Sequence, residues 1–311
     1  MTDLPDIRTL VVGEALVDAV TTPDGATAEH VGGSPANVAF GLAALEHPVD
    51  LATWIGRDAR GERIAAHCAE RGVTLTEGSR GAAATSLAHA TLDASGAATY
   101  VFDLEWHVAP VPHLQTYGHV HTGSIGAVLE PGGHEVRAVL EAARAIGATV
   151  SYDPNARPTL MGAPADARRV IEAAVVLADV VKLSDEDVEW LCPGEALDDV
   201  VRGWGELGPA VVVVTRGGQG ALVRVTATGE QVSLPAPAVR VVDTVGAGDS
   251  FMAGLVSGLL DAGLLGGAEA RDRLHAATLA DVTPAVERAL LTGALTVQRA
   301  GAFAPSRSAL R

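Results

Sequence analysis

The sequence predicts an α/β fold in which helices cover both faces of a mostly parallel sheet, with a small separate β-lid. Three observations lead to this fold class. Short apolar, β-branched runs alternate with alanine-rich stretches of helical length. Continuous apolar strands separated by helices are typical of parallel sheets buried on both faces. Two further regions alternate apolar with small polar residues, which is typical of strands exposed on one face.

Each strand predicted for the main sheet runs into a glycine or a polar residue, as expected where a strand gives way to a loop. These strands cover residues 9–12, 51–55, 118–121, 148–152, 180–183 and 210–215. Helices are predicted at about 35–45, 58–71, 132–146, 164–177, 195–205, 249–262 and 284–299. Ligands of such sheets bind beyond the carboxyl ends of the strands, so we expect the site at that edge.

The lid is predicted from two insertions, at about 16–31 and 85–104. Both carry a turn signal, Pro-Asp-Gly at 23–25 and Asp-Ala-Ser-Gly at 93–96, between alternating runs. We therefore expect a single domain over residues 1–311 with this lid attached. The sequence leaves open whether two copies pair through the lid strands to form a homodimer.

Composition narrows the class of protein. The chain is 48% hydrophobic and 19% charged, which favours a large folded core over disorder. Its net charge of −16 argues against nucleic acid or a membrane as a partner, because both require a basic surface. The N-terminus has no secretory pattern, and Cys68 and Cys192 have no metal-like spacing. A cytoplasmic enzyme is expected.

The most informative motif is Asp-Thr-Val-Gly-Ala-Gly-Asp-Ser at 243–250, which leads directly into an apolar helical stretch. The N–H groups of Gly246, Ala247 and Gly248 lie at the positive end of that helix, where an anion can approach them. Asp249 then lies where it can accept a proton. An anion cradle with a base beside it suits phosphoryl transfer to a hydroxyl. Alone, the motif also fits a tight turn with an aspartate cap.

Two N-terminal segments carry groups suited to a polyol. Asp18 follows a predicted strand and can accept protons from two neighbouring hydroxyls, while Asn37 and the N–H of Gly33 can donate. Gly32 and Gly33 form the turn that opens the next helix. A solvated Asp18 and a plain turn explain the same residues.

Three later segments suit a nucleotide. Arg157 follows a strand in Asp-Pro-Asn-Ala-Arg-Pro, and its planar guanidinium can bind phosphate. The acids after Ser184 fit a capped helix start and also suit Mg²⁺ held through water. The turn 215–220 can cradle a phosphate tail or be a simple hairpin. A P-loop is excluded because Lys182, the single lysine, lacks the glycine pattern before it.

His119 and His121 lie on one face of a predicted strand. No carboxylate or cysteine completes a zinc ligand set beside them, so we expect them in the core or at its rim.

Taken together, the motifs resemble those of the ribokinase (PfkB) carbohydrate kinases. Their amino-acid sequences are most similar to those of the fructokinase-like branch. The resemblance extends from Val-Val-Gly-Glu at 11–14 to Gly-Ala at 301–302. The 243–249 motif is highly specific for this family, and the 32–37 and 151–157 segments match it as well. Glu46 departs from the usual small residue. The resemblance implies a ribokinase-like three-layer α/β/α fold with a β-lid.

The resemblance also implies roles for individual residues. Asp249 would be the base, with Gly246, Ala247 and Gly248 as the anion hole for the γ-phosphate and Arg157 near the transferring phosphate. Asp18, Gly32, Gly33 and Asn37 would bind the sugar. Thr215, Gly217 and Gly220 would line the ATP site with Leu290, which stands where relatives often carry Asn or His. Asp187 would help to organise Mg²⁺ through water, and Asp243, Val245 and Ala300 would surround a monovalent cation such as K⁺.

The expected function is ATP-dependent transfer of phosphate to a primary hydroxyl of a small sugar, most simply fructose. Ribose, 2-keto-3-deoxygluconate and a nucleoside stay open as acceptors. A non-catalytic sugar-binding regulator on the same fold is the alternative from another class, although a protein that only binds has no need of Asp249 as a base.

Overall fold

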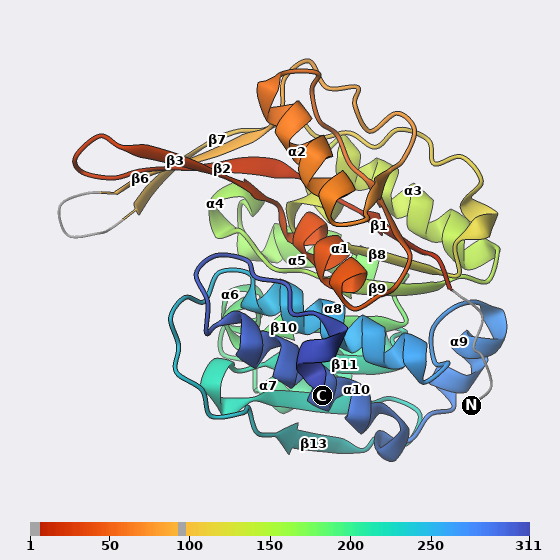
Figure 1. The fold of residues 1–311 in the computed structure, drawn as a ribbon. Helices are drawn as coiled ribbons and strands as arrows, with labels where there is room; N and C mark the ends of the chain where they lie inside the picture. The colour runs from red at the N-terminus through yellow and green to blue at the C-terminus, as the bar shows by residue number, and fades with distance from the viewer. Residues whose placement is uncertain (1–6, 93–97) are drawn as a thin grey trace.

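The computed structural model describes residues 7–92 and 98–311. Within them, nine strands form the main sheet and four form a second, smaller sheet (Figure 1). In spatial order the main sheet contains β13 (Gln231–Leu234), β12 (Ala221–Val225), β11 (Val211–Thr215), β10 (Val180–Ser184), β9 (Thr149–Asp153), β8 (His119–Gly123), β1 (Thr9–Val12), β4 (Val49–Ala52) and β5 (Thr74–Leu75). All neighbouring pairs from β11 to β5 are parallel, whereas β12 and β13 are antiparallel.

Helices cover both faces of this sheet, and the sheet separates two hydrophobic clusters. One face carries α1 (Ser34–Ala44), α2 (Ala59–Glu70), α8 (Ala247–Asp261), α9 (Ala268–His275) and α10 (Leu279–Thr296). The other carries α3 (Gly132–Ala145), α4 (Pro158–Met161), α5 (Pro164–Val175), α6 (Asp185–Leu191) and α7 (Leu197–Glu206). Successive strand residues alternate between the clusters, as Val211 and Val212 do. The predicted three-layer α/β/α class is thus confirmed.

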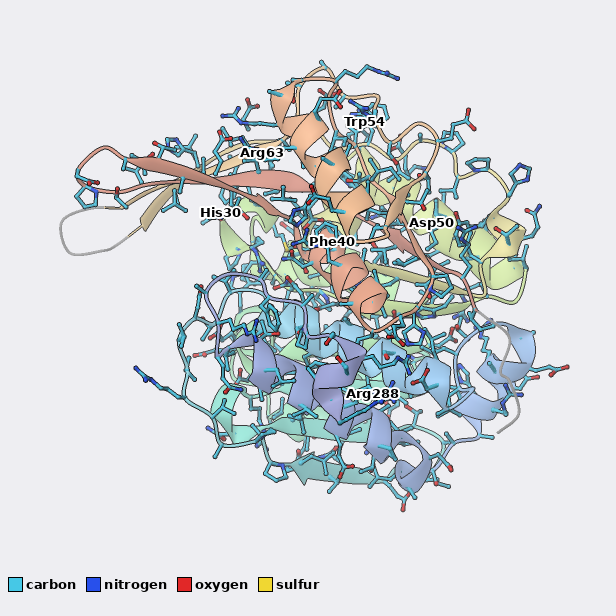
Figure 2. The ribbon with its side chains drawn as sticks, viewed as in Figure 1. His30, Phe40, Asp50, Trp54, Arg63 and Arg288 are labelled. Atoms are coloured by element: carbon cyan, nitrogen blue, oxygen red, sulfur yellow. The ribbon has the colours of Figure 1, made fainter. Side chains whose placement is uncertain are left out.

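The smaller sheet is the lid, with strands in the order β3 (Thr27–Gly32), β2 (Leu16–Thr21), β6 (Leu87–Leu92) and β7 (Ala98–Asp103). Figure 1 shows it projecting sideways from the body of the molecule. At its base, Glu29 on β3 accepts hydrogen bonds from Arg60 and Arg63 of α2. Figure 2 labels Arg63 where α2 meets the lid. The turn at 23–25 joins β2 to β3 as predicted. The predicted turn at 93–96 lies outside the described residues.

Helix α8 packs unusually closely against its neighbours. A Cβ on Gly254 would lie 2.3 Å from Oγ1 of Thr292, and one on Gly258 would lie 2.5 Å from Cα of Ala285, both on α10. On the opposite side, a Cβ on Gly41 of α1 would lie 2.5 Å from Cβ of Ala253. These glycines let three helices approach almost backbone to backbone.

Two predicted boundaries were wrong for identifiable reasons. The strand predicted at 51–55 is β4, which ends at Ala52, because the N–H of Ile55 donates to the Ser79 carbonyl instead of continuing the ladder. The helix predicted to begin at 284 is α10, which begins at Leu279. Thr278 caps it in a reciprocal pair with Asp281, and Pro284 lies inside the helix.

No helix in the two described stretches is both long and apolar enough to cross a bilayer.

The predicted core position of the two strand histidines is confirmed. His119 and His121 on β8 are buried, and Ser151 bridges them, its Oγ 2.9 Å from Nε2 of His119 and from Nδ1 of His121. Burial lowers the pKa of His119 to about 4 and that of His121 to about 3. At any pH between these values and the ordinary histidine pKa, the unfolded chain binds more protons than the folded chain. The stability held by these neutral rings is therefore present at neutral pH and lost as the pH falls below about 6.5.

We predict that His121→Asn lowers the free energy of unfolding at pH 7. The difference in that free energy between wild type and variant should be smaller by about 2 kcal/mol at pH 5. The reason is that only the wild type must then keep this ring unprotonated. Urea unfolding at both pH values measures the difference. His134→Asn, at an exposed ring, is the control. A His121→Asn effect of equal size at both pH values would contradict the buried neutral state.

Candidate active site

A cavity of about 910 Å³ lies where β9, β10 and β11 end, between the lid and the N-terminus of α8. Most of the residues predicted for the site border it: Asp18, Gly33, Asn37, Arg157, Asp187, Thr215, Gly217, Gly220, Val245, Gly246, Ala247, Gly248, Asp249 and Leu290. Gly32, Asp243 and Ala300 do not border the cavity. The carboxyl edge of the sheet thus gathers segments that lie far apart in the sequence.

The glycine-rich turn starts α8 with exposed donors. Gly246 is the N-cap in a left-handed conformation with φ 74°, and a Cβ there would lie 2.6 Å from Cβ of Ala302. In the described part of the chain, the N–H groups of Gly246, Gly248 and Asp249 have no hydrogen-bond partner. Ala247 departs from the expectation, because its N–H donates to the Thr244 carbonyl at 3.2 Å. The free donors of the turn are therefore those of residues 246, 248 and 249.

Asp249 is held from two other segments. Its carboxylate accepts hydrogen bonds from Oγ of Ser34 at 2.7 Å and from Nδ2 of Asn37 at 2.8 Å, both on α1. Nδ2 of Asn155 lies 3.4 Å from the same carboxylate and donates to Ser34 at 2.7 Å. The side chain is buried, so these contacts fix its direction toward the cavity. Asn37 thereby contacts Asp249 and also borders the cavity.

Asp18 faces this centre from the lid. Burial raises the pKa of its carboxyl, and the charges of Arg157 and His30 oppose that rise. Gly32 lies opposite Leu16 on the neighbouring strand, where a Cβ would stand 1.9 Å from Oδ2 of Asp18. Gly32 therefore leaves space for the carboxylate instead of lining the cavity itself.

Arg157 borders the cavity with its guanidinium turned back onto its own loop. Its Nη1 donates to the Asn155 carbonyl at 2.9 Å, to Oδ1 of Asn155 at 2.7 Å and to the Ala156 carbonyl at 3.0 Å. The side chain is exposed, so the loop and the solvent both surround it.

Asp187 links the two strand ends on the nucleotide side. Its carboxylate accepts hydrogen bonds from the N–H groups of Ala156 at 2.7 Å and Ser184 at 2.8 Å. In return, the backbone N–H of Asp187 donates to the Ser184 hydroxyl. This is the predicted cap, and it leaves Asp187 at the cavity wall. The predicted hairpin at 215–220 joins antiparallel β11 and β12, and Leu290 of α10 closes the far wall.

Asp243 joins the turn to a distant loop. One of its oxygens accepts from the Val245 N–H at 3.0 Å and the other from the Gly301 N–H at 2.8 Å. These two bonds keep the pKa of Asp243 below its usual range. They also bring the loop that contains Ala300 next to the glycine-rich turn. Within the described residues, no group of three or more His, Cys, Asp or Glu side chains is arranged to hold a metal ion.

Several residues of the site did not emerge as candidates from the sequence. Ser34 and Asn155 lie inside segments that were recognised, but only the fold shows that they contact Asp249. Glu14 is buried at the cavity wall, where it accepts from the Gly126 N–H at 3.1 Å. Burial raises the pKa of Glu14 to about 7. Lys182 also borders the cavity. The sequence feature that could have marked it as a site residue is that it is the single lysine of the chain.

Comparison with known proteins agrees with this geometry. Residues 7–309 match the pfkB family carbohydrate kinases. The chain is 34% identical to a fructokinase of Klebsiella pneumoniae over 265 residues, covering 82% of this chain and 85% of that enzyme. It is 32% identical to a fructokinase of Escherichia coli over 268 residues, with 82% and 85% covered.

Solved structures give the same result. The fructokinase of Xylella fastidiosa with bound ATP superposes with a TM-score of 0.83 at 26% identity, covering 97% of this chain and 96% of that one. The aminoimidazole riboside kinase of Salmonella enterica, complexed with aminoimidazole riboside and an ATP analogue, superposes with a TM-score of 0.79 at 25% identity, covering 97% and 98%. The fold, the arrangement at the strand ends and these matches agree, and the chain belongs to the pfkB family of carbohydrate kinases.

Proposed function

We propose that this kinase transfers the γ-phosphate of ATP to the primary hydroxyl of fructose. The observation that carries the proposal is the buried Asp249 carboxylate, aimed into the cavity beside the free N–H groups of a helix N-terminus. The sugar is inferred from the curated relatives, which are fructokinases at 30% identity or more across about four-fifths of the chain. As a member of the pfkB family, the chain is a phosphotransferase with an alcohol group as acceptor.

In the proposed reaction the sugar hydroxyl lies between Asp18 and Asp249, with the γ-phosphate at the turn. Asp249 takes the hydroxyl proton as the sugar oxygen forms a bond to the γ-phosphorus. The bond from that phosphorus to the β–γ bridging oxygen breaks, and ADP leaves with the electron pair. The N–H groups of Gly246, Gly248 and Asp249 donate to the equatorial oxygens, where negative charge is spread in the transition state.

The donor set also fits the proposed cations. Mg²⁺ in kinases is held mainly by phosphates and water with one or two carboxylates, and it neutralises phosphate charge when bound. Asp187 at the cavity wall suits contact through water, since both of its oxygens already accept backbone N–H groups. For K⁺ we propose Asp243 with the carbonyls of Val245 and Ala300. The hydrogen bond that the Gly301 N–H donates to Asp243 supports this set by drawing the two loops together.

One alternative acceptor has a specific observation behind it. A nucleoside-like acceptor is favoured by the likeness to the aminoimidazole riboside kinase, at a TM-score of 0.79. Ribose and 2-keto-3-deoxygluconate remain candidates because Asp18 recognises hydroxyl pairs in general. A non-catalytic regulator is disfavoured because Ser34, Asn37 and Asn155 all orient a base that binding alone does not need.

We expect Asp249→Asn to lower kcat by about 10²–10⁴-fold with little change in the KM for sugar, because the variant loses the proton acceptor and keeps its polar contacts. Ser34→Ala is the matched comparison. It keeps the carboxylate but loses a contact that orients it, so we expect a smaller decrease in kcat. Steady-state kinetics with unfolding midpoints for each variant provide the measurement. A near-normal kcat for Asp249→Asn would refute the assignment of the base.

We expect fructose to give the highest kcat/KM in an ADP-release assay over fructose, ribose, other ketoses, 2-keto-3-deoxygluconate and nucleosides. The assay is run with K⁺ and with a bulky monovalent cation in its place, and K⁺ should raise the rate. A higher kcat/KM with a nucleoside would replace the proposed substrate and leave the kinase class intact. No ADP release with any acceptor would favour the regulator.

We further propose that the protein is cytoplasmic, supported by two free buried cysteines, and that two copies pair through the lid. Val101 on the lid strand β7 is 66% exposed, which supports an apolar contact there. Sedimentation equilibrium should give the mass of a dimer for the wild type and of a monomer for Val101→Asp. A monomeric wild type would contradict pairing.

A further inference from the structure

Lys182, which borders the active-site cavity, forms a buried ion pair with Asp153. Nζ of Lys182 lies 2.6 Å from Oδ2 of Asp153, and the two side chains are 3% and 1% exposed. Lys182 lies in the middle of β10, and Asp153 is the last residue of the adjacent strand β9. A buried pair of this kind costs desolvation energy and is weak evidence of a stabilising role. Its position suggests a use in the reaction.

The ammonium of Lys182 lies beside the anion-binding turn. A Cβ built on Gly248 would lie 3.3 Å from Nζ of Lys182. The N–H of Gly248 is among the free donors of the turn in the described chain. The ammonium and the free N–H of Gly248 therefore lie at the same residue of the turn, and a Cβ at position 248 would contact the ammonium.

The charges around the cavity make this cation important. Among the described residues that border it, the cations are Arg157 and Lys182. The acids are Glu14, Asp18, Asp185, Glu186, Asp187 and Asp249. Arg157 is exposed and donates to carbonyls of its own loop. Lys182 is thus the buried cation at the phosphate end of a strongly acidic cavity.

Asp153 holds the Lys182 ammonium in place and leaves some of its N–H donors free. An ammonium has three protons to donate, and one carboxylate oxygen engages only part of that capacity. The other oxygen of Asp153, Oδ1, is buried without a hydrogen-bond partner in the described residues. Burial raises the pKa of Asp153 to about 7, and the positive charge of Lys182 opposes the rise. The pair thus holds Nζ of Lys182 next to the turn with donors left for a ligand.

We propose that Lys182 is a further catalytic residue, whose ammonium contacts the transferring γ-phosphoryl group, and that Asp153 is its positioning residue. This inference rests on the proposed kinase function. Lys182 stays protonated throughout: Asp249 takes the sugar proton, the sugar oxygen bonds to phosphorus, and ADP leaves with the electrons of the broken bond. The ammonium donates to a phosphoryl oxygen whose negative charge grows during that step.

Paired variants separate this role from a structural one. If Lys182 only neutralises Asp153, the double variant Lys182→Met with Asp153→Asn should restore activity, because it buries a neutral pair of similar shape. If Lys182 contacts the phosphoryl group, the double variant should be as slow as Lys182→Met alone. Arg169→Met removes an exposed surface cation and serves as the control.

We expect Lys182→Met and the double variant each to lose about 10²–10³-fold in kcat, as enzymes do when one transition-state donor is removed. The KM for fructose should stay nearly constant, because the sugar does not touch this group. Asp153→Asn alone should lose less, since the ammonium remains. A double variant with near-wild-type kcat would overturn the proposal, even where Asp249→Asn confirms the kinase reaction.

The single lysine allows a direct test on the unmodified protein. Biosynthetic labelling of lysine with ¹³C at Cε gives one lysine side-chain NMR signal for the whole chain. We expect that signal to shift with the magnesium complex of AMPPNP, which carries a γ-phosphoryl group, and to stay close to its free position with magnesium ADP. Equal shifts with both nucleotides would overturn the contact. This test uses the wild-type protein, so no variant has to fold. It also needs no sugar, so the result does not depend on which acceptor the enzyme uses.

Discussion

The structure depends on one buried carboxylate at the positive end of a helix. Asp249 belongs to α8, yet its oxygens accept hydrogen bonds from Ser34 and Asn37 of α1, with Asn155 from the end of β9 beside them. Burying a charge is costly unless such donors are supplied, so these segments must meet wherever the carboxylate is buried. The requirement explains why the chemistry lies at the carboxyl edge of the sheet, where the loops after parallel strands converge with the first turns of helices.

An acidic protein that binds a polyanion must rely on local groups. With a net charge of −16 the long-range field repels a nucleotide, and the acids around the cavity add to that repulsion. The free N–H groups at the start of α8 compensate without any side-chain charge, because they are dipoles already oriented by the helix. Such donors need no reorganisation when phosphate charge develops, which is the feature that makes preorganised sites effective.

The fold class, the placing of motifs at strand ends and most cavity residues could be predicted from the sequence, because apolar periodicity and glycine-rich turns are local signals. Contacts between distant segments could not. The bond from Ser34 to Asp249 spans 215 positions, and no spacing rule contains it. The occupied N–H of Ala247 depends on the fine geometry of one turn. Gly32 was expected at the sugar, but only the strand pairing shows that it makes room for Asp18.

The close packing of α8 has a consequence for how such an enzyme diversifies. Gly254 and Gly258 leave almost no volume between α8 and α10, so the helix that carries the base cannot move without disturbing the core. The lid is a separate sheet that touches the body mainly at its base, where Glu29 meets α2. The proposed sugar contact on the lid, Asp18, therefore belongs to a different element from the helix that carries Asp249. A substitution elsewhere on the lid sheet can reshape the wall around the acceptor without touching the close packing of α8 against α10.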